Sequence, residues 1–241
     1  MLLHTNPLFS IYFGDASDHL FPQQYRSVAD NTLLLQEKPF EQVKKTMGID
    51  SLIFLHQVHG VSGEIITVAN QSQFRPFSQD GDFIITNTKS GIGVLTADCL
   101  PLVFHDYFHN VVMVVHAGWR GSVNGVVQNA LDTMRSKFST NREHLRVFFG
   151  PSAKACCYEV SSNFGKQLEA YPFADQVILP RNGKTYFDLP GFNRLVLESF
   201  GIKKEVMFLE YNICTMCNDS FYSYRRQGEQ AGRQMTVVCL K

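Results

Sequence analysis

The sequence predicts an α/β protein whose sheets contain both parallel and antiparallel strands. Short apolar segments rich in β-branched residues alternate with segments in which apolar residues recur every three or four positions, the patterns of buried strands and amphipathic helices. Several neighbouring strand candidates are joined by links too short for a helical crossover, which favours mixed sheets. The 241 residues contain no low-complexity linker, fixed-period repeat or charge block, so we expect one domain spanning residues 1–241.

Each expected element rests on one of these patterns. Residues 37–47 form a helix candidate that Gly48 would end, because glycine readily adopts the left-handed conformation after a helix. A second helix candidate runs from Val123 to Met134, with Ser122 or Asn124 as its N-cap. Two more helices are expected at residues 161–170 and 191–200. The strand candidates are residues 51–55, 83–86, 92–96, 102–104, 111–115, 145–149, 206–209 and 235–240.

Composition and charge narrow the class of protein. A hydrophobic content of 44% with 12% aromatic residues is sufficient for a large core. The 22 basic residues balance the 22 acidic ones without a basic stripe that would neutralise phosphates, so nucleic acid is not expected as a partner. Residues 1–13 lack the pattern of a signal peptide, and no stretch reaches the ~18 apolar residues of a membrane span. We therefore expect a cytoplasmic protein with no membrane partner, whose six cysteines are reduced.

The junction after residues 111–115 is the most informative part of the chain. This apolar run is expected to be a buried strand that places His116 at its carboxyl end. The helix that follows would direct unpaired N–H groups toward the same place, so an anion could bind beside Arg120. The alternative is a tight turn whose glycines serve packing and whose Trp119, the only tryptophan, fills the core.

Three candidate metal ligands, His59, Cys99 and His116, each follow a strand candidate. If these strand ends converge, two imidazoles and one thiolate would form a three-ligand site suited to zinc. Three protein ligands leave one position open for water or substrate, as in catalytic zinc sites. The alternative is that each is a packed core residue, the commoner role of an isolated His or Cys. His59 is favoured over His56, because residues three apart in an extended segment point to opposite faces.

Asp98 and the arginines near the carboxyl terminus complete the candidate set. Asp98 could orient a ligating histidine or accept a proton, or it could be a carboxylate satisfied within a turn. Arg225 and Arg226 carry planar guanidiniums that suit phosphate or carboxylate, with Arg233 in reserve. Adjacent arginines are also often a solvated surface pair.

The cysteines offer one further pattern. Cys214 and Cys217 have the spacing of half a zinc knuckle or of a redox pair. Cys156 and Cys157 are adjacent in the sequence. Because no second cysteine pair follows Cys217 at a distance that would complete a four-cysteine site, we expect a structural or incidental role for Cys214 and Cys217.

Five ordered motifs resemble one known family. They are Gln57-Val58-His59-Gly60, Thr96-Ala97-Asp98-Cys99, His116-Ala117-Gly118-Trp119-Arg120-Gly121, Gly150-Pro151-Ser152 with Cys157-Tyr158-Glu159-Val160, and Ser223-Tyr224-Arg225-Arg226. The chain resembles the laccase-domain family, once called multicopper polyphenol oxidases and now regarded as purine nucleoside phosphorylases. The likeness extends from about Leu52 to the carboxyl terminus. Asp188-Leu189 followed by Asn193, and Cys214-Thr215, also fit its later segments.

The resemblance implies a layered α/β/β/α fold and a zinc ion bound by His59, Cys99 and His116. It also implies phosphorolysis of adenosine, inosine and methylthioadenosine, with deamination of adenosine at the same site. The partners would be a purine nucleoside and phosphate. The segment from Leu8 to Gly14 departs from the family, whose members usually carry an arginine there, and this difference concerns the substrate range.

The expected mechanism assigns a task to each remaining candidate. For phosphorolysis, Arg120, the following helix terminus and Arg225 or Arg226 would hold the phosphate while it attacks the ribose anomeric carbon and the purine departs. For deamination, zinc would lower the pKa of bound water to about 7, with Asp98 as a proton shuttle.

Two other functions stay open from the residues alone. Cys99 could be the nucleophile of a hydrolase with His116 as its base, an arrangement that needs no metal. The chain could also be a metal-stabilised nucleotide-binding module without turnover. Copper oxidase chemistry is disfavoured, because the chain contains no His-X-His pair and no recognisable blue-copper set of two His, one Cys and a nearby Met.

Overall fold

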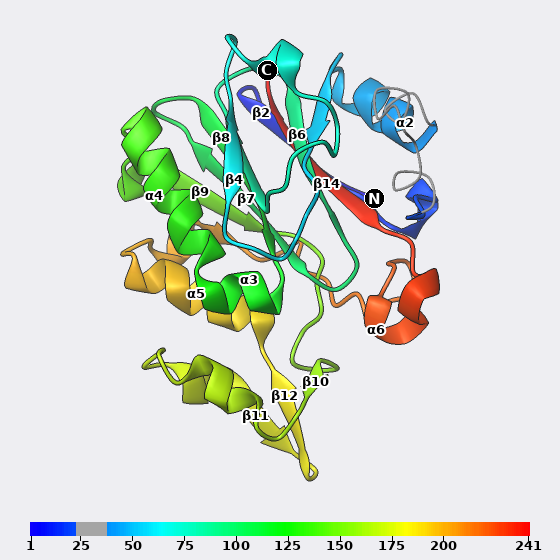
Figure 1. Cartoon of the computed structure of the whole chain (residues 1–241), viewed down its shortest axis with the longest axis vertical. Helices are drawn as coiled ribbons and strands as arrows, with labels where there is room; N and C mark the ends of the chain where they lie inside the picture. The colour runs from blue at the N-terminus through cyan, green and yellow to red at the C-terminus, as the bar shows by residue number, and fades with distance from the viewer. Residues whose placement is uncertain (23–37) are drawn as a thin grey trace.

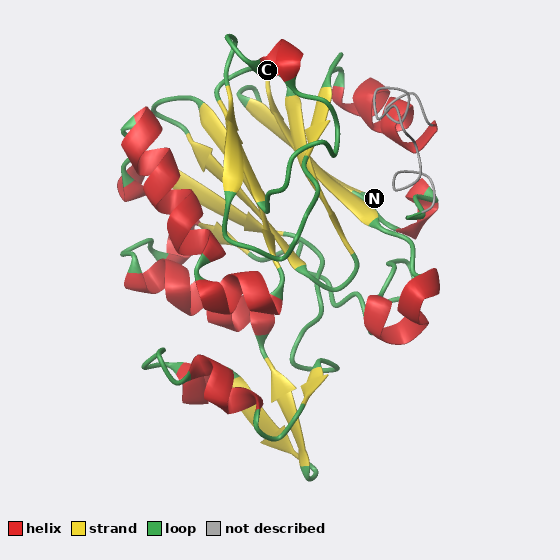
Figure 2. Ribbon diagram, in the orientation of Figure 1, coloured by secondary structure: helices red, strands yellow, loops and turns green. Residues whose placement is uncertain are grey.

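The computed structural model describes residues 1–22 and 38–241. Two β-sheets pack face to face, and helices cover the outer face of each sheet (Figure 1; Figure 2). Helix α2 (Lys38–Met47) lies on one outer face, and α3 (Trp119–Asn124), α4 (Val126–Phe138) and α5 (Leu189–Ser199) lie on the other. This order of layers is the α/β/β/α sandwich with mixed sheets that we expected.

One sheet has six strands in the order β13-β9-β7-β8-β5-β4. Its centre is antiparallel, because β7 pairs in that direction with both β8 and β9, whereas the edge strands β4 and β13 run parallel to their neighbours. The strands are β4 (Gly63–Ile66), β5 (Phe83–Thr86), β7 (Leu100–Asp106), β8 (Val111–Ala117), β9 (Leu145–Phe149) and β13 (Met207–Phe208). All but β4 were expected, and β7 and β8 are longer than predicted.

The other sheet has five strands in the order β1-β2-β14-β6-β3, with β3 parallel to β6 and the remaining pairs antiparallel. The strands are β1 (Leu2–Thr5), β2 (Phe9–Phe13), β3 (Leu52–Phe54), β6 (Gly91–Thr96) and β14 (Gln234–Leu240). The hairpin of β1 and β2 was not predicted. Its uniformly buried second strand joins the sheet only by pairing with β14, more than 200 residues away in the sequence.

The main core fills the space between the two sheets. Ile11, Val94 and Val238 of the five-stranded sheet face Val103 and Phe148 of the six-stranded one in a single buried cluster. Because successive side chains of a strand point to opposite faces, the alternate residues face outward, where α2 covers one sheet and α4 the other. Both sheets are therefore buried on both faces, which explains their nearly continuous apolar strands.

The helices differ from the prediction at two points. The first residue of the expected helix 37–47 lies outside the described residues, and its remainder is α2, followed by Gly48 at φ 68°. The single helix expected after His116 is instead two helices, α3 and α4, because Gly125 takes φ 95° between them. Gly118 and Gly125 are the N-caps, so the proposed caps Ser122 and Asn124 were wrong. Helix α5 begins two residues before the expected helix 191–200, and α6 (Tyr224–Gln227) is a single turn.

The expected helix at residues 161–170 is wrong. Only the 3-10 helix η5 (Phe164–Leu168) forms there, because Gly165 weakens a helix and Pro172 cannot continue one. Beside it, β10 (Glu159–Val160), β11 (Ile178–Arg181) and β12 (Lys184–Phe187) form a small antiparallel sheet at the lower end of the molecule in Figure 1. The other 3-10 helices of the described residues are η1 (Ala16–Asp18), η3 (Gln71–Gln73), η4 (Arg142–His144), η6 (Ala174–Gln176), η7 (Lys204–Val206) and η8 (Gly228–Gln230).

Among the described residues, no helix has both the length and the apolar character needed to cross a bilayer.

Candidate active site and metal centre

His59, Cys99 and His116 lie together where β3, β6 and β8 end. Their ligand atoms are all within 4.8 Å of one another. The Cys99 Sγ is 3.7 Å from Nε2 of His59, and the two imidazole rings are 4.7 Å apart at 77°. The convergence of strand ends expected from the sequence is therefore present. His59 takes φ 57°, which supplies the bend that turns it to the site, whereas His56 pairs with Asp80 at 2.8 Å.

A fully buried carboxylate, Asp82, holds two members of this trio in place. It accepts the backbone N–H groups of His59 at 3.0 Å and Gly60 at 2.6 Å, and it bonds Nδ1 of His116 at 2.7 Å. Since Nδ1 is engaged, Nε2 is the nitrogen of His116 available as a ligand. Our sequence reasoning missed Asp82. The available signal was an acidic residue directly before an apolar strand that pairs with β8.

Gly118 is required by the close approach of helix α3 to the trio. A Cβ atom there would lie 2.9 Å from the Cys99 Sγ and 3.0 Å from Cδ2 of His59. Gly121, one turn further along the helix, faces the carbonyl of Gly60, which a Cβ would meet at 3.0 Å. The two glycines let the helix backbone form one wall of the site.

The electrostatics of the trio favour a charged sulfur. Burial acts to raise the pKa of the Cys99 thiol, but the neighbouring His116 and His59 outweigh it and lower this pKa to about 6. Burial acts to lower the pKa of His116, but Cys99 and Asp82 raise it to about 9. Burial also acts to raise the pKa of Asp82, yet the hydrogen bond from His116 and those from the backbone lower it. Without a metal ion, these pKa shifts favour a Cys99 thiolate beside a protonated His116 at neutral pH.

Asp98 is buried and fully engaged by the carboxyl-terminal segment. One oxygen accepts the hydroxyl of Thr215 at 2.7 Å, and the other accepts the hydroxyl of Ser223 at 3.0 Å and the N–H of Arg225 at 2.7 Å. Asp98 itself takes φ 88°, directly before Cys99. Of the roles considered from the sequence, this geometry matches the carboxylate satisfied within a turn, which here anchors a distant segment beside the trio.

A cavity of about 1310 Å³ opens over the trio. Its walls include two arginine and aromatic pairs. The Arg120 guanidinium lies 4.9 Å from the centroid of the Trp119 ring, and that of Arg225 lies 4.8 Å from the Tyr158 ring. Arg233 also lines the cavity. The site thus combines candidate metal ligands, aromatic rings and guanidiniums.

Comparison with known proteins identifies the family. The model described as multi-copper polyphenol oxidoreductase laccase matches residues 26–241. The chain belongs to this family. A purine nucleoside phosphorylase of Borreliella burgdorferi is 29% identical over 225 residues, covering 88% of this chain and 94% of the relative. An adenosine deaminase of an unknown prokaryotic organism is 31% identical over 206 residues, covering 80% and 76%. The crystal structure of YfiH from Bacillus licheniformis superposes with a TM-score of 0.84 at 23% identity, covering 97% of this chain and 93% of that one, and shares the fold.

Two segments of this laccase-family chain do not reach the cavity. Arg226 points away from it and donates to the carbonyls of Thr215 at 2.9 Å and Phe221 at 2.6 Å, so the two adjacent arginines have different surroundings. In the described part of the chain, none of residues 8–14, where an arginine was expected from relatives, lines the cavity.

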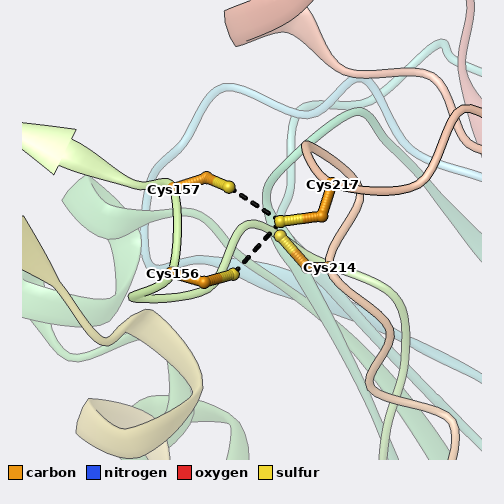
Figure 3. Close-up of side chains that lie close together, drawn as sticks. All are labelled: Cys156, Cys157, Cys214 and Cys217. Carbon is orange, nitrogen blue, oxygen red and sulfur yellow. Dashed lines mark hydrogen bonds between the residues drawn. The ribbon is translucent and has the colours of Figure 1, made fainter.

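The structure places two further cysteines beside Cys214 and Cys217. The adjacent Cys156 and Cys157 lie against them, with the four sulfur atoms within 4.8 Å of one another (Figure 3). A parallel bridge between Ser152 and Cys214 brings the two loops together. The second cysteine pair therefore exists, but it precedes Cys214 in the sequence instead of following Cys217.

Proposed function

We propose that this laccase-family protein is a zinc-dependent purine nucleoside phosphorylase that converts adenosine, inosine or methylthioadenosine and phosphate to a free purine and a ribose 1-phosphate, and that also deaminates adenosine. The observation that carries the proposal is the placement of His59, Cys99 and His116 beneath a cavity lined by Arg120 and Arg225. The names of relatives, purine nucleoside phosphorylase and adenosine deaminase, support the same assignment.

The trio suits zinc by its donor chemistry. Two imidazole nitrogens and a thiolate are borderline and soft ligands, and three protein ligands leave one position for a reactant. The same His, His and Cys set also binds blue copper, but that site usually adds a methionine, and no methionine lines the described cavity. When bound, zinc would supply a Lewis acid that polarises a substrate oxygen or a water molecule.

Arg120 and Arg225 are the proposed phosphate ligands. Each guanidinium lies against an aromatic ring of the cavity wall, and Nη1 of Arg225 also donates to the carbonyl of Glu159 at 2.9 Å, so the remaining N–H groups are those proposed to bind phosphate oxygens. Helix α3 has only six residues, so the arginines supply most of the positive charge. Phosphate oxygen would bond to the anomeric carbon as the bond to the purine nitrogen breaks, and the purine leaves with a proton.

Asp98 is proposed as a positioning residue, in place of the proton shuttle suggested by the sequence. Its oxygens already accept three hydrogen bonds, and it fixes the backbone of Arg225 relative to Cys99. The general acid that protonates the purine is thus expected elsewhere on the cavity wall.

The decisive experiment incubates purified protein with adenosine, inosine and methylthioadenosine, each with and without phosphate. We expect phosphate-dependent release of the purine and of ribose 1-phosphate, and phosphate-independent conversion of adenosine to inosine. Saturable nucleoside binding without product would instead favour a metal-stabilised binding module.

The pKa of Cys99 gives one alternative a specific basis. A thiolate beside an imidazolium is the arrangement of cysteine hydrolases, in which Cys99 would attack substrate and His116 would transfer the proton. Metal content separates the two functions. Activity that disappears with a stoichiometric zinc ion on chelation and returns when zinc is added excludes the free nucleophile, whereas full activity of metal-free protein would establish it.

A further inference from the structure

A second group of metal-binding side chains lies outside the cavity. Cys156, Cys157, Cys214 and Cys217 come from two loops and direct their sulfur atoms to a common point (Figure 3). The Cys217 sulfur is 2.7 Å from that of Cys157 and 3.4 Å from that of Cys156, and all four sulfurs fit within 4.8 Å. Such a group of thiols has no role in the function proposed above.

We propose that these four cysteines bind one zinc ion in a closed, structural site. Zinc–sulfur bonds of about 2.3 Å in a tetrahedron place the sulfur atoms roughly 3.8 Å apart, so small movements of the side chains would complete the geometry. Cys214 and Cys217 have the two-residue spacing common in structural zinc sites. Four thiolates fill the coordination sphere, so the ion has no position for a reactant.

The local backbone explains how two adjacent cysteines can serve one ion. The N–H groups of Cys157 and Tyr158 both donate to the carbonyl of Lys154, at 3.0 and 2.9 Å, which closes a tight turn. In a helical turn, successive side chains diverge by about 100°, whereas in a strand they point to opposite faces. Cys156 and Cys157 can therefore approach the same point from one loop.

The two loops are held together by bonds that do not involve sulfur. The N–H of Ser152 donates to the carbonyl of Ile213 at 3.0 Å, and the N–H of Thr215 donates to that of Ser152 at 3.1 Å. The side-chain amide of Asn212 donates to the carbonyl of Gly150 at 2.6 Å. The protein thus forms most of the site before an ion binds.

Cationic side chains surround the cysteines. Lys154 donates to the carbonyl of Asn212 at 3.1 Å, Arg181 to that of Cys156 at 2.9 Å, and Arg226 to that of Met216 at 3.1 Å. Four thiolates and one divalent ion carry a net charge of about −2, which nearby cations stabilise. The position of Arg226 away from the cavity is consistent with this use.

The proposed ion would brace the cavity wall. Thr215 lies between the two cysteines of the second loop and bonds Asp98, while Tyr158 follows Cys157 and lines the cavity. The site would thereby fix the positions of Thr215 and Tyr158 beside Cys99. It is independent of the reaction catalysed there, because it contributes no ligand to the first trio.

The test measures bound metal in intact protein prepared with zinc under reducing conditions. We expect about two equivalents of zinc in the wild type, about one in Cys99→Ala, and about one in Cys217→Ala. Cys239→Ala is the matched control, because Cys239 is a buried cysteine of β14 outside both groups, and it should keep both ions. Cobalt substituted into Cys99→Ala should give the visible spectrum of a tetrahedral tetrathiolate.

Two results would overturn the proposal. One is that the wild type binds a single equivalent of zinc and that Cys99→Ala binds none. The other is a mass decrease of about 2 Da per bond without reductant, which would show that the four cysteines form disulfides instead. If Cys217→Ala does not fold, the cobalt spectrum of Cys99→Ala decides the question without it, and absence of the tetrathiolate bands refutes the site.

Discussion

The two candidate metal-binding groups of this protein differ in the number of donors and in their surroundings. His59, Cys99 and His116 supply three ligands at the bottom of a large cavity, whereas the cysteine group supplies four ligands from two loops. An ion with three protein ligands keeps a position for a reactant, and an ion with four does not. Zinc could therefore support catalysis at the trio and stabilise the fold at the cysteine group.

The supporting residues differ in a corresponding way. The trio is backed by a carboxylate, Asp82, because the imidazole of His116 needs an acceptor for its Nδ1–H. The cysteine group has Lys154, Arg181 and Arg226 beside it, and these cations would offset the negative charge of four thiolates around the proposed ion.

Cys99→Ala should separate the two groups most strongly. We expect phosphorolysis to fall at least about a thousandfold, since the Lewis acid contributes several kcal/mol. The cysteine group should keep its ion, and loss of the ion at the trio should lower the melting temperature by no more than the roughly 10 °C expected for loss of one ion. Nucleoside turnover and thermal unfolding measure the two effects, and near wild-type turnover would contradict our assignment of the trio.

Cys217→Ala should lower stability while leaving turnover nearly intact. When the free zinc concentration is 100 to 1,000 times the Kd, the bound ion contributes about 3–4 kcal/mol to the free energy of unfolding. Its loss should therefore lower the melting temperature by roughly 10 °C. Turnover at low temperature should remain within about threefold of wild type. Calorimetry with and without a zinc chelator checks the result, and Cys239→Ala is the control for loss of a thiol alone.

Arg120→Ala and Arg226→Ala should distinguish the cavity from the cysteine loop. Removal of Arg120 should raise the KM for phosphate about 10- to 100-fold, because a hydrogen bond to a charged group contributes about 1.5–3 kcal/mol. Removal of Arg226 should leave that KM unchanged and lower stability, since its guanidinium bonds loop carbonyls. Steady-state kinetics with varied phosphate decide the assignment, and a raised KM in Arg226→Ala would count against it.

Asp82→Asn should weaken zinc binding at the trio alone. Loss of an outer carboxylate typically costs about 10- to 100-fold in metal affinity. The amide can still bond His116, so the fold should persist. Competition with a chromophoric chelator should show one weakened ion and one unchanged ion, and weakening of both would mean that the groups are coupled.

The pKa of Cys99 predicts how metal-free protein reacts with iodoacetamide. The thiolate is the reactive form, and the pKa is lowered to about 6, so alkylation should be fast at pH 7 and fall as the pH drops through 6. Between pH 7 and pH 5 the rate should fall about tenfold. Mass spectrometry of the Cys99 peptide follows the reaction. A midpoint near pH 9 would contradict the influence of His116.

Local sequence patterns were sufficient to predict most strands of the two large sheets. Strands β5, β8, β9 and β14 were predictable because their runs of apolar, β-branched residues favour buried strands whatever their partners. The predictions of helices failed where a single glycine changes the local backbone conformation. Gly125 divides the expected helix into α3 and α4, and the segment around Gly165 forms only a 3-10 helix.

The sequence alone determined the α/β class and the candidate ligands His59, Cys99 and His116, because strand propensity and ligand chemistry are properties of residues and their close neighbours. The tertiary structure decided which distant groups meet. It placed Asp82 behind His116, turned Arg226 away from Arg225, and brought the two cysteine loops together. The contact of Asp82 with His116 spans 34 residues and that of Cys156 with Cys217 spans 61, whereas Arg226 bonds Thr215 across 11. The energy that selects such contacts comes from packing the whole core.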